Sequence, residues 1–125
     1  MSDLSGKKKI LIVDDARENI AILVETLKAE YKVVPALNGE KALKLASSEN
    51  PPDLILLDIM MPGIDGHEVC RRLQADVSTK GIPVIFLSGK DSEDEKQKGI
   101  ELGAVDYITK PIDPSVVTEK VKSHI

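Results

Sequence analysis

Five short apolar segments recur along the chain, and stretches with a helical spacing of apolar residues lie between and after them. Each segment has four or five residues, which is a usual length for a buried strand. The regular alternation of strands with helices indicates an α/β fold, in which helices cover both faces of a parallel sheet. The five expected strands are Ile10–Val13, Lys32–Ala36, Leu54–Leu57, Val84–Leu87 and Val105–Ile108.

The helical stretches carry their apolar residues on one face, at spacings of three and four. The fourth stretch differs, because its charged run DSEDEKQK at residues 91–98 contains no large apolar residue. Only Ile100 and Leu102 are available to anchor that helix, so we expect little burial to hold it in place. The other faces consist of Ile20, Leu23, Val24 and Leu27, of Ala42, Leu43 and Ala46, of Gly66, Val69, Cys70 and Leu73, and of Val116, Val117 and Val121.

The polarity of the strand segments predicts their order in the sheet. ILIV, LILL and VIFL are continuously apolar, as expected of central strands that are covered on both faces. Pro35 cannot donate to a strand ladder and therefore belongs at an edge, and Asp106 gives the fifth segment an alternating pattern that also fits an edge. These features predict the doubly wound, flavodoxin-like (βα)5 order 2-1-3-4-5, in which ligands bind beyond the carboxyl ends of strands 1 and 3.

Polar residues stand where four of the strands end. Asp14 and Asp15 follow the first strand, Asp58 the third and Ser88 the fourth, and Lys110 lies just beyond the fifth. Two unit charges ~4 Å apart repel by about 4 kcal/mol at an effective dielectric near 20, so three carboxylates at one edge require a cation, raised pKa values, or both. Mg²⁺, or Mn²⁺ in its place, prefers such oxygen ligands. With the ion bound, one carboxylate could act as a nucleophile toward a phosphoryl group.

Each of these residues also has a purely structural interpretation. Asp15 stands three residues before Glu18 and could be the N-cap of a capping box. Asp58 could simply end a strand, Ser88 could belong to a turn, and Lys110 could be a solvated surface residue. Five suitable groups at the ends of four strands favour the functional interpretation.

Four segments, ILIVDD, LILLDIMMPGIDG, VIFLSGK and DYITKP, resemble in order and spacing the motifs of receiver domains of two-component response regulators. The resemblance covers residues 7–124. It implies that Asp58 accepts a phosphoryl group from the phosphohistidine of a sensor histidine kinase or a histidine phosphotransfer protein. Asp14, Asp15, Asp58 and the backbone carbonyl of Met60 would hold the metal ion.

The same resemblance implies how a signal leaves the domain. Lys110 and Ser88 would contact the phosphoryl oxygens, and Ser88 would move toward them while Tyr107, the aromatic switch residue, turns inward. The face formed by the fourth helix, the fifth strand and the fifth helix would then change shape for a partner or for a second copy of the chain. The resemblance also implies a cis Lys110–Pro111 peptide. The chain would be a phosphoacceptor switch and not an enzyme, apart from catalysing its own phosphorylation and slow dephosphorylation.

Three other functions fit less well. A phosphatase of the aspartyl-phosphate type usually has a second carboxylate two residues after its nucleophile, where this chain has Met60. A nucleotide or flavin binder needs a glycine-rich loop after the first strand, where this chain has DDA. A pseudo-receiver binds partners without phosphorylation, and the complete acidic set with Ser88 and Lys110 argues against that class.

Composition and size bound these possibilities. A chain of 125 residues makes one domain, which we divide into a tail at residues 1–6 and a receiver domain at 7–125. A net charge of −4 without a dominant basic patch gives no reason to expect direct nucleic-acid binding, and no segment approaches the ~18 apolar residues of a membrane span. The single cysteine, Cys70, cannot form an internal disulfide and fits a packing role in a reducing cytoplasm.

The end of the sequence has a helical pattern without a C-cap glycine, up to Ile125. We therefore expect a receiver domain cut from a longer regulator that continues into an output domain after residue 125. A natural single-domain receiver is the alternative, and Ile125 is expected to be exposed in either case. We also expect His124 to be solvated at the end of this helix. His67, at the start of the third helix, is not expected to carry a phosphoryl group.

Overall fold

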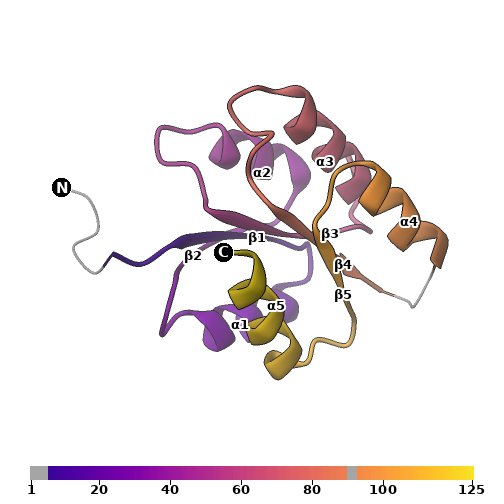
Figure 1. Cartoon of the computed structure of the whole chain (residues 1–125). Coiled ribbons are helices and arrows are strands. Elements are labelled where there is room, and N and C mark those ends of the chain that lie inside the picture. Colours follow the sequence, from indigo (N-terminus) through magenta and orange to yellow (C-terminus); the bar gives the residue numbers. More distant parts are fainter. Residues whose placement is uncertain (1–5, 90–92) are drawn as a thin grey trace.

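The computed structural model describes residues 6–89 and 93–125, and it contains one parallel sheet with helices on both faces (Figure 1). The strand order is β2-β1-β3-β4-β5, so the predicted fold class and strand order are confirmed. The strands are β1 (Lys9–Val13), β2 (Lys32–Ala36), β3 (Leu54–Asp58), β4 (Val84–Ser88) and β5 (Asp106–Thr109). The helices are α1 (Arg17–Leu27), α2 (Gly39–Ala46), α3 (Gly66–Ala75), α4 (Glu93–Glu101) and α5 (Pro114–His124).

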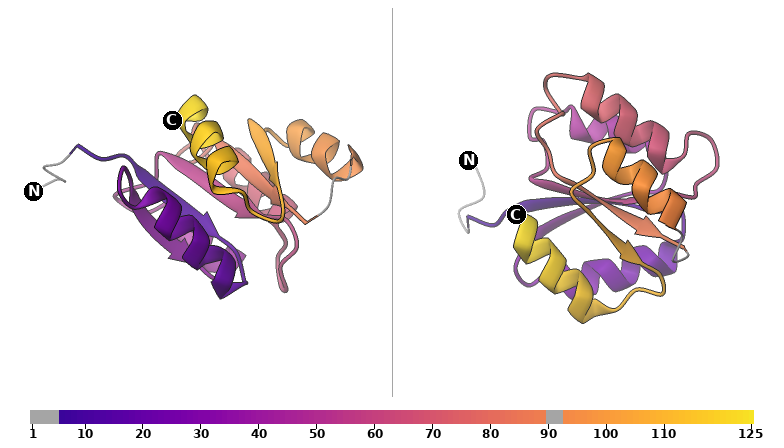
Figure 2. Two further views of the ribbon diagram at one scale, coloured as in Figure 1. Left: turned by 90° about the horizontal axis from the view of Figure 1, so that it is seen from below. Right: turned by 45° about the vertical axis from the view of Figure 1, so that its right-hand side comes forward.

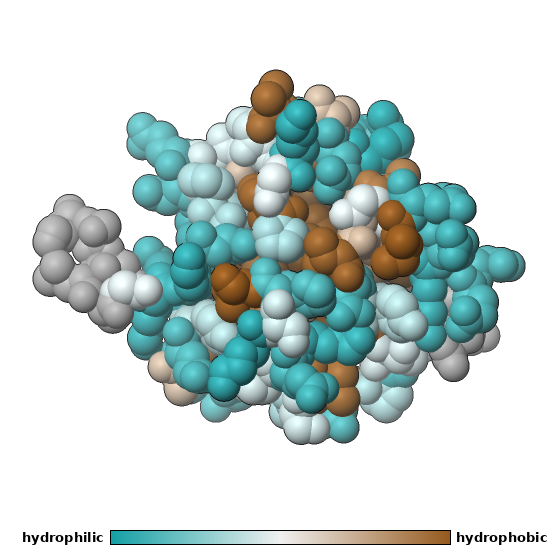
Figure 3. All heavy atoms as spheres, viewed as in Figure 1, coloured by the Kyte–Doolittle hydropathy of each residue, from teal (hydrophilic) through white to brown (hydrophobic). Residues whose placement is uncertain are grey.

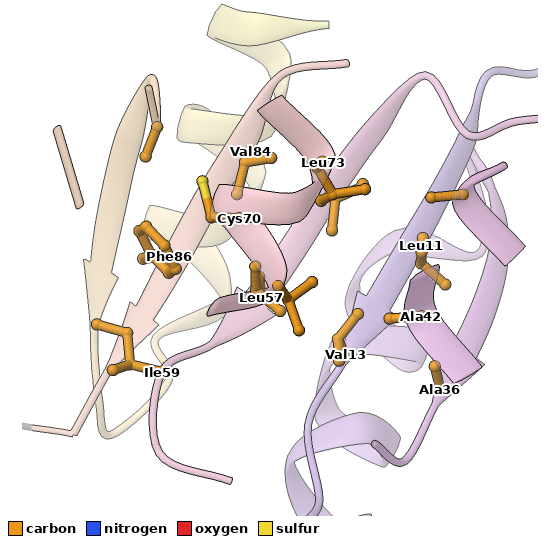
Figure 4. Close-up of a cluster of buried hydrophobic side chains, with 14 of the residues drawn as sticks. Leu11, Val13, Ala36, Ala42, Leu57, Ile59, Cys70, Leu73, Val84 and Phe86 are labelled. Atoms are coloured by element: carbon orange, nitrogen blue, oxygen red, sulfur yellow. The ribbon is translucent and has the colours of Figure 1, made fainter. Parts of the chain in front are cut away.

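The sheet divides the core into two layers, because successive side chains of a strand point to opposite faces. Figure 2 shows α1 and α5 on one face and α2, α3 and α4 on the other. Ile12 of β1 and Leu56 of β3 pack toward α1 and α5. Leu11 and Leu57 pack toward α2 and α3, in the cluster drawn in Figure 4. Burial on both faces explains why the central strands are continuously apolar.

Three strands, β3, β4 and β5, extend one residue further toward the predicted functional edge than the apolar pattern indicated, whereas β1 and β2 end where predicted. Asp58 is the last residue of β3 and lies opposite Leu87, and Ser88 is the last residue of β4 and lies opposite Thr109. The fifth strand begins at Asp106 instead of Val105. Polar residues therefore take part in the strand ladder, which holds their side chains at defined positions at the end of the sheet.

Three helices begin with a side-chain cap that accepts a backbone hydrogen bond, as helix N-termini require. Asn38 accepts from the N–H of Lys41 at 2.8 Å, and Asp65 accepts from the N–H of Glu68 at 2.9 Å. Asp113 does the same at the start of α5, with proline in the first turn. These caps fix where α2, α3 and α5 leave the edge of the sheet.

The first helix begins differently. Its N-cap residue is Ala16, which has no side-chain cap hydrogen bond, while Asp15 is exposed one residue earlier. The interpretation of Asp15 as the N-cap of a capping box is therefore wrong. The carboxylate beside the start of this helix belongs to Asp14, whose Oδ1 accepts from the Ala16 N–H at 2.9 Å.

The fourth helix contacts β4 of the sheet through a glycine. Gly99 lies against the ring of Phe86 on β4, and a Cβ at this position would be 2.7 Å from the ring carbon Cδ2. Leu102 packs partly against the core, but Ile100 is 47% exposed, so the expectation that Ile100 anchors this helix is wrong. A helix with so little apolar contact can shift at a small cost in free energy.

The last helix packs more completely than the sequence suggested. Ile125 is half-buried against the layer that contains α1 and α5, so the expectation that it is exposed is wrong. The imidazole Nε2 of His124 lies 3.0 Å from Asp106 Oδ2, so the expectation of a solvated His124 is wrong as well. Cys70 is fully buried as a packing residue, and burial raises the pKa of its thiol to about 11.

One face of the molecule is mainly polar. The face in Figure 3 is covered largely by hydrophilic residues, with apolar residues exposed near the middle of the view. Within residues 6–89 and 93–125, no helix combines the length and the apolar character that a membrane span requires.

Candidate functional site

The ends of β1 and β3 bring three carboxylates together at one edge of the sheet. Asp14 follows β1, and its N–H donates to the carbonyl of Ala36 at 3.1 Å, which continues the pairing with β2. Asp14 is 0% exposed and Asp58 is 2% exposed, whereas Asp15 faces solvent. Each of the three offers an oxygen within 4.8 Å of the others. The structure thus brings together the three acidic residues that the sequence predicted would meet.

One ammonium group lies against this acidic cluster of Asp14, Asp15 and Asp58. The Nζ of Lys110 is 3.1 Å from Asp58 Oδ1 and 3.2 Å from Asp14 Oδ2. Burial lowers the pKa of Lys110, but the hydrogen bonds and charges of Asp58 and Asp14 outweigh burial and raise it above its usual value. The backbone N–H of Lys110 donates to the Ser88 carbonyl at 2.7 Å, and the Lys110–Pro111 peptide is cis, as the resemblance implied.

Among the described residues one lysine contacts the cluster, and its charge does not balance the three carboxylates, as the pKa of Asp58 reflects. Burial and then the charge of Asp14 raise the pKa of Asp58 from 3.8 to about 6, against opposing hydrogen bonds from Lys110 and the Met60 N–H. An additional cation would relieve this cost by favouring the ionised carboxylate. Carboxylate oxygens at such mutual distances fit a hard divalent ion such as Mg²⁺.

Mg²⁺ at millimolar concentration should therefore raise the melting temperature of the protein. The ion would bind the folded cluster and not the unfolded chain, which adds about 2.7 kcal/mol of stability at 100 times the dissociation constant. Differential scanning fluorimetry with and without Mg²⁺ measures this shift, with a sodium salt of equal ionic strength as the control. Equal melting temperatures in the two salts would count against a metal site.

The other predicted residues lie at the same edge or near it. Ser88 is fully buried at the end of β4. Met60 follows Asp58 by two residues, and its side chain is 67% exposed. Tyr107 on β5 is half-buried, and two ammonium groups lie near its ring, with Lys96 Nζ 4.4 Å and Lys120 Nζ 5.2 Å from the ring centroid. Their positions are compatible with the predicted roles in phosphoryl contact, metal coordination and switching, which stay predictions.

Asp106 connects β5 with the last turns of α5. Its carboxylate accepts from Lys120 Nζ at 2.8 Å and lies 3.0 Å from His124 Nε2. Burial would raise the pKa of Asp106, but hydrogen bonds from Lys120, the Tyr107 N–H and His124 outweigh burial and keep this pKa below its usual range. These charged groups lie beside Tyr107. Their hydrogen bonds connect β5 to α5.

Two neighbours of the acidic cluster were not identified from the sequence as site residues. Asn19, in the first turn of α1, donates from Nδ2 to Asp14 Oδ2 at 3.2 Å. The feature of the sequence that could have identified Asn19 is a side-chain amide in the first helical turn after Asp14 and Asp15. Gly66 at the start of α3 lies against the Asp58 carbonyl and the Cα of Ile59, where a side chain would collide with backbone. The backbone that Gly66 touches belongs to the end of β3, which carries Asp58.

His67 has a structural environment that the sequence did not indicate. It is 8% exposed, and its ring meets the ring of Phe86 edge-on, with the centroids 5.3 Å apart. Its Nε2 is buried and has no hydrogen-bond partner among the described residues. The ring therefore belongs to the core between α3 and β4, and its burial supports the expectation that it carries no phosphoryl group.

Comparison with known proteins is consistent with this geometry. Residues 10–122 match the family model described as the response regulator receiver domain. The chain is 44% identical over 116 residues to the response regulator PleD of Caulobacter vibrioides, covering 92% of this chain and 25% of PleD. It is 45% identical over 117 residues to the alkaline phosphatase synthesis transcriptional regulatory protein PhoP of Bacillus subtilis, covering 93% of this chain and 48% of PhoP.

Among solved structures, the chemotaxis protein CheY4 of Vibrio cholerae superposes with a TM-score of 0.89 at 28% identity, covering 96% of this chain and 100% of that one. The chain thus spans about a quarter of PleD and about half of PhoP, but the whole length of the CheY4 chain. Since the family model covers most of the chain, the chain belongs to the receiver domains of two-component response regulators.

Proposed function

We propose that Asp58 of this receiver domain accepts a phosphoryl group, with Mg²⁺ or Mn²⁺ held by Asp14, Asp15, Asp58 and the backbone carbonyl of Met60. The observation that carries the proposal is the cluster of three carboxylates with oxygens within 4.8 Å of one another, together with the Lys110 ammonium in contact with two of them. Burial and the charge of Asp14 raise the pKa of Asp58, so this arrangement costs stability in the metal-free protein.

In the proposed reaction an ionised oxygen of Asp58 attacks phosphorus and forms a new P–O bond. The P–N bond of the phosphohistidine breaks, and its electron pair stays on the imidazole nitrogen, which takes up a proton. When bound, the divalent ion supplies positive charge that keeps Asp58 ionised and offsets the charge of the phosphoryl oxygens. Lys110 can turn from the carboxylates toward a phosphoryl oxygen, and the Ser88 hydroxyl can donate to another, which is mainly positioning and charge neutralisation.

The signal would leave through the face formed by α4, β5 and α5. Ser88 lies opposite Thr109 and Phe86 lies opposite Tyr107, so a movement of Ser88 would reach β5 through neighbouring strand pairs. Shifting a switch from 1:99 to 99:1 requires about 5.5 kcal/mol of differential stabilisation. Because α4 contacts β4 through the small residue Gly99 and buries little apolar surface, displacing this helix costs little free energy.

The partners follow from the same reaction. The phosphoryl donor would be a sensor histidine kinase or a histidine phosphotransfer protein in the cytoplasm. Because the regulators compared above are two to four times as long, an output domain beyond residue 125 would read the changed face, or two copies of the chain would pair through it. The domain would act as a switch and not as an enzyme, apart from catalysing its own phosphorylation and slow dephosphorylation.

A direct test uses acetyl phosphate as the donor. Intact-mass measurement after incubation with acetyl phosphate and Mg²⁺ should detect one added phosphoryl group, which alkali removes, and none when EDTA replaces Mg²⁺. The competing proposal is a phosphatase, which would release phosphate steadily from unrelated phosphate esters. That outcome without a stable adduct would refute the switch.

A further inference from the structure

We propose that Asn19 is a positioning residue of the acidic cluster, because its side-chain amide holds the Asp14 carboxylate in the orientation that binds the divalent ion. This inference rests on the proposed function, because it requires that the cluster binds a divalent ion. Asn19 belongs to none of the motif segments on which the family resemblance depends. It lies in the first turn of α1 and is half-buried beside Asp14.

Three donors among the described residues hold the Asp14 carboxylate. The Ala16 N–H donates to Oδ1 at 2.9 Å, whereas Asn19 Nδ2 and Lys110 Nζ both reach Oδ2 at 3.2 Å. Because an ionised carboxylate only accepts hydrogen bonds, the amide nitrogen of Asn19 must be the group that faces it. The orientation of Asp14 thus depends on one backbone group and two side chains.

The two side chains are not equivalent. Lys110 also contacts Asp58 at 3.1 Å, and in the proposed reaction it turns toward the phosphoryl group. Among the described residues, the Asn19 side chain forms a hydrogen bond only with Asp14. It therefore still donates to Oδ2 when Lys110 moves away. Its amide is neutral and therefore orients Asp14 without the repulsion that a second ammonium would exert on a bound cation.

Helix stability does not explain an asparagine at this position. Asparagine is a weaker helix former than alanine, and its favourable place is the N-cap, which Ala16 occupies here. The Asn19 amide bonds to Asp14 instead of capping a backbone N–H. Groups that orient metal ligands in this way typically change metal affinity by 10–100-fold when they are removed.

The test compares Asn19→Ala with Asn50→Ala, the same chemical change at an exposed position far from the cluster. Mg²⁺ affinity is measured by calorimetric titration without any phosphoryl donor. We expect Asn19→Ala to weaken Mg²⁺ binding about tenfold, while Asn50→Ala binds like the wild type. Equal affinity of the Asn19→Ala and wild-type proteins would overturn the inference. Absence of Mg²⁺ binding by the wild type would overturn the proposed function itself.

A second measurement separates positioning from a general structural role. Because Asn19 acts through metal affinity, acetyl phosphate should label Asn19→Ala more slowly at low Mg²⁺ and at the wild-type rate once Mg²⁺ is saturating. The metal-free melting temperature should stay close to that of the wild type. A labelling rate that stays low at saturating Mg²⁺, or a large fall in the metal-free melting temperature, would overturn the inference.

Discussion

Asp58→Asn is expected to make the metal-free protein more stable at neutral pH, by up to about 3 kcal/mol, and to abolish phosphoryl acceptance. Asp58 is 2% exposed and its pKa is raised from 3.8 to about 6 by burial and by the charge of Asp14. A shift of one pKa unit corresponds to 1.36 kcal/mol, so two units amount to roughly 3 kcal/mol. Asparagine removes this cost, and Lys110 keeps its contact with Asp14. Chemical denaturation in EDTA measures the gain.

The pH dependence of this gain follows from proton binding. Between about pH 4 and pH 6 the folded chain holds a proton on Asp58 that the unfolded chain has released, so stability falls as pH rises through this window. The full cost is present above about pH 6 and absent below about pH 4. The advantage of Asp58→Asn should therefore vanish in acid. Asp15→Asn is the control, because Asp15 is exposed and its charge is screened by solvent; an equal gain in this control would contradict the account.

Gly66→Ala is expected to destabilise the protein by about 3 kcal/mol, at the upper end of what overpacking usually costs. A Cβ on Gly66 would collide with the carbonyl oxygen of Asp58 and would lie 2.7 Å from the Cα of Ile59. These obstacles are backbone atoms of the strand end, and the Gly66 N–H also donates to the Ile59 carbonyl at 2.8 Å, so neither side can move freely. Thermal unfolding should show a melting temperature lower by roughly 10 °C.

Gly81→Ala is the matched control for this substitution. Nothing lies within 4 Å of a Cβ at Gly81, so the same added methyl group meets open space. This control should melt within about 0.5 kcal/mol of the wild type, or slightly higher because alanine restricts the unfolded chain. If Gly66→Ala behaves like Gly81→Ala, the close approach between α3 and the end of β3 is not the constraint described above.

The acidic cluster could be located from the sequence because two regularities act together. Parallel strands end at one edge of the sheet, and the continuous apolar character of three segments determines which strands are central. Asp14 and Asp58 follow the first and second of these three segments, which form the neighbouring strands β1 and β3, so they had to meet once the strand order was known. Pro35 and Asp106 identified the two edge strands, because both residues are unfavourable in a central strand.

Contacts that depend on close packing could not be predicted in this way. Gly99 stands in a segment without apolar periodicity, yet it makes the contact with Phe86 that brings α4 onto the sheet, while the more obvious anchor Ile100 is exposed. The pairing of His124 with Asp106 joins residues 18 positions apart whose side chains meet only when α5 folds back onto β5. The bond from Asn19 to Asp14 likewise depends on the direction in which α1 leaves the strand.

The central claim is that Asp58, supported by a divalent ion at the acidic cluster, is the residue that captures phosphorus. Its most direct test is chemical mapping of the modified residue. The protein is treated with acetyl phosphate and Mg²⁺ and then reduced with borohydride, which converts an aspartyl phosphate to homoserine, and the altered residue is located by peptide sequencing in a mass spectrometer. The account predicts homoserine at position 58 alone; homoserine at Asp14 or Asp15 with Asp58 intact, or no altered aspartate at all, would contradict it.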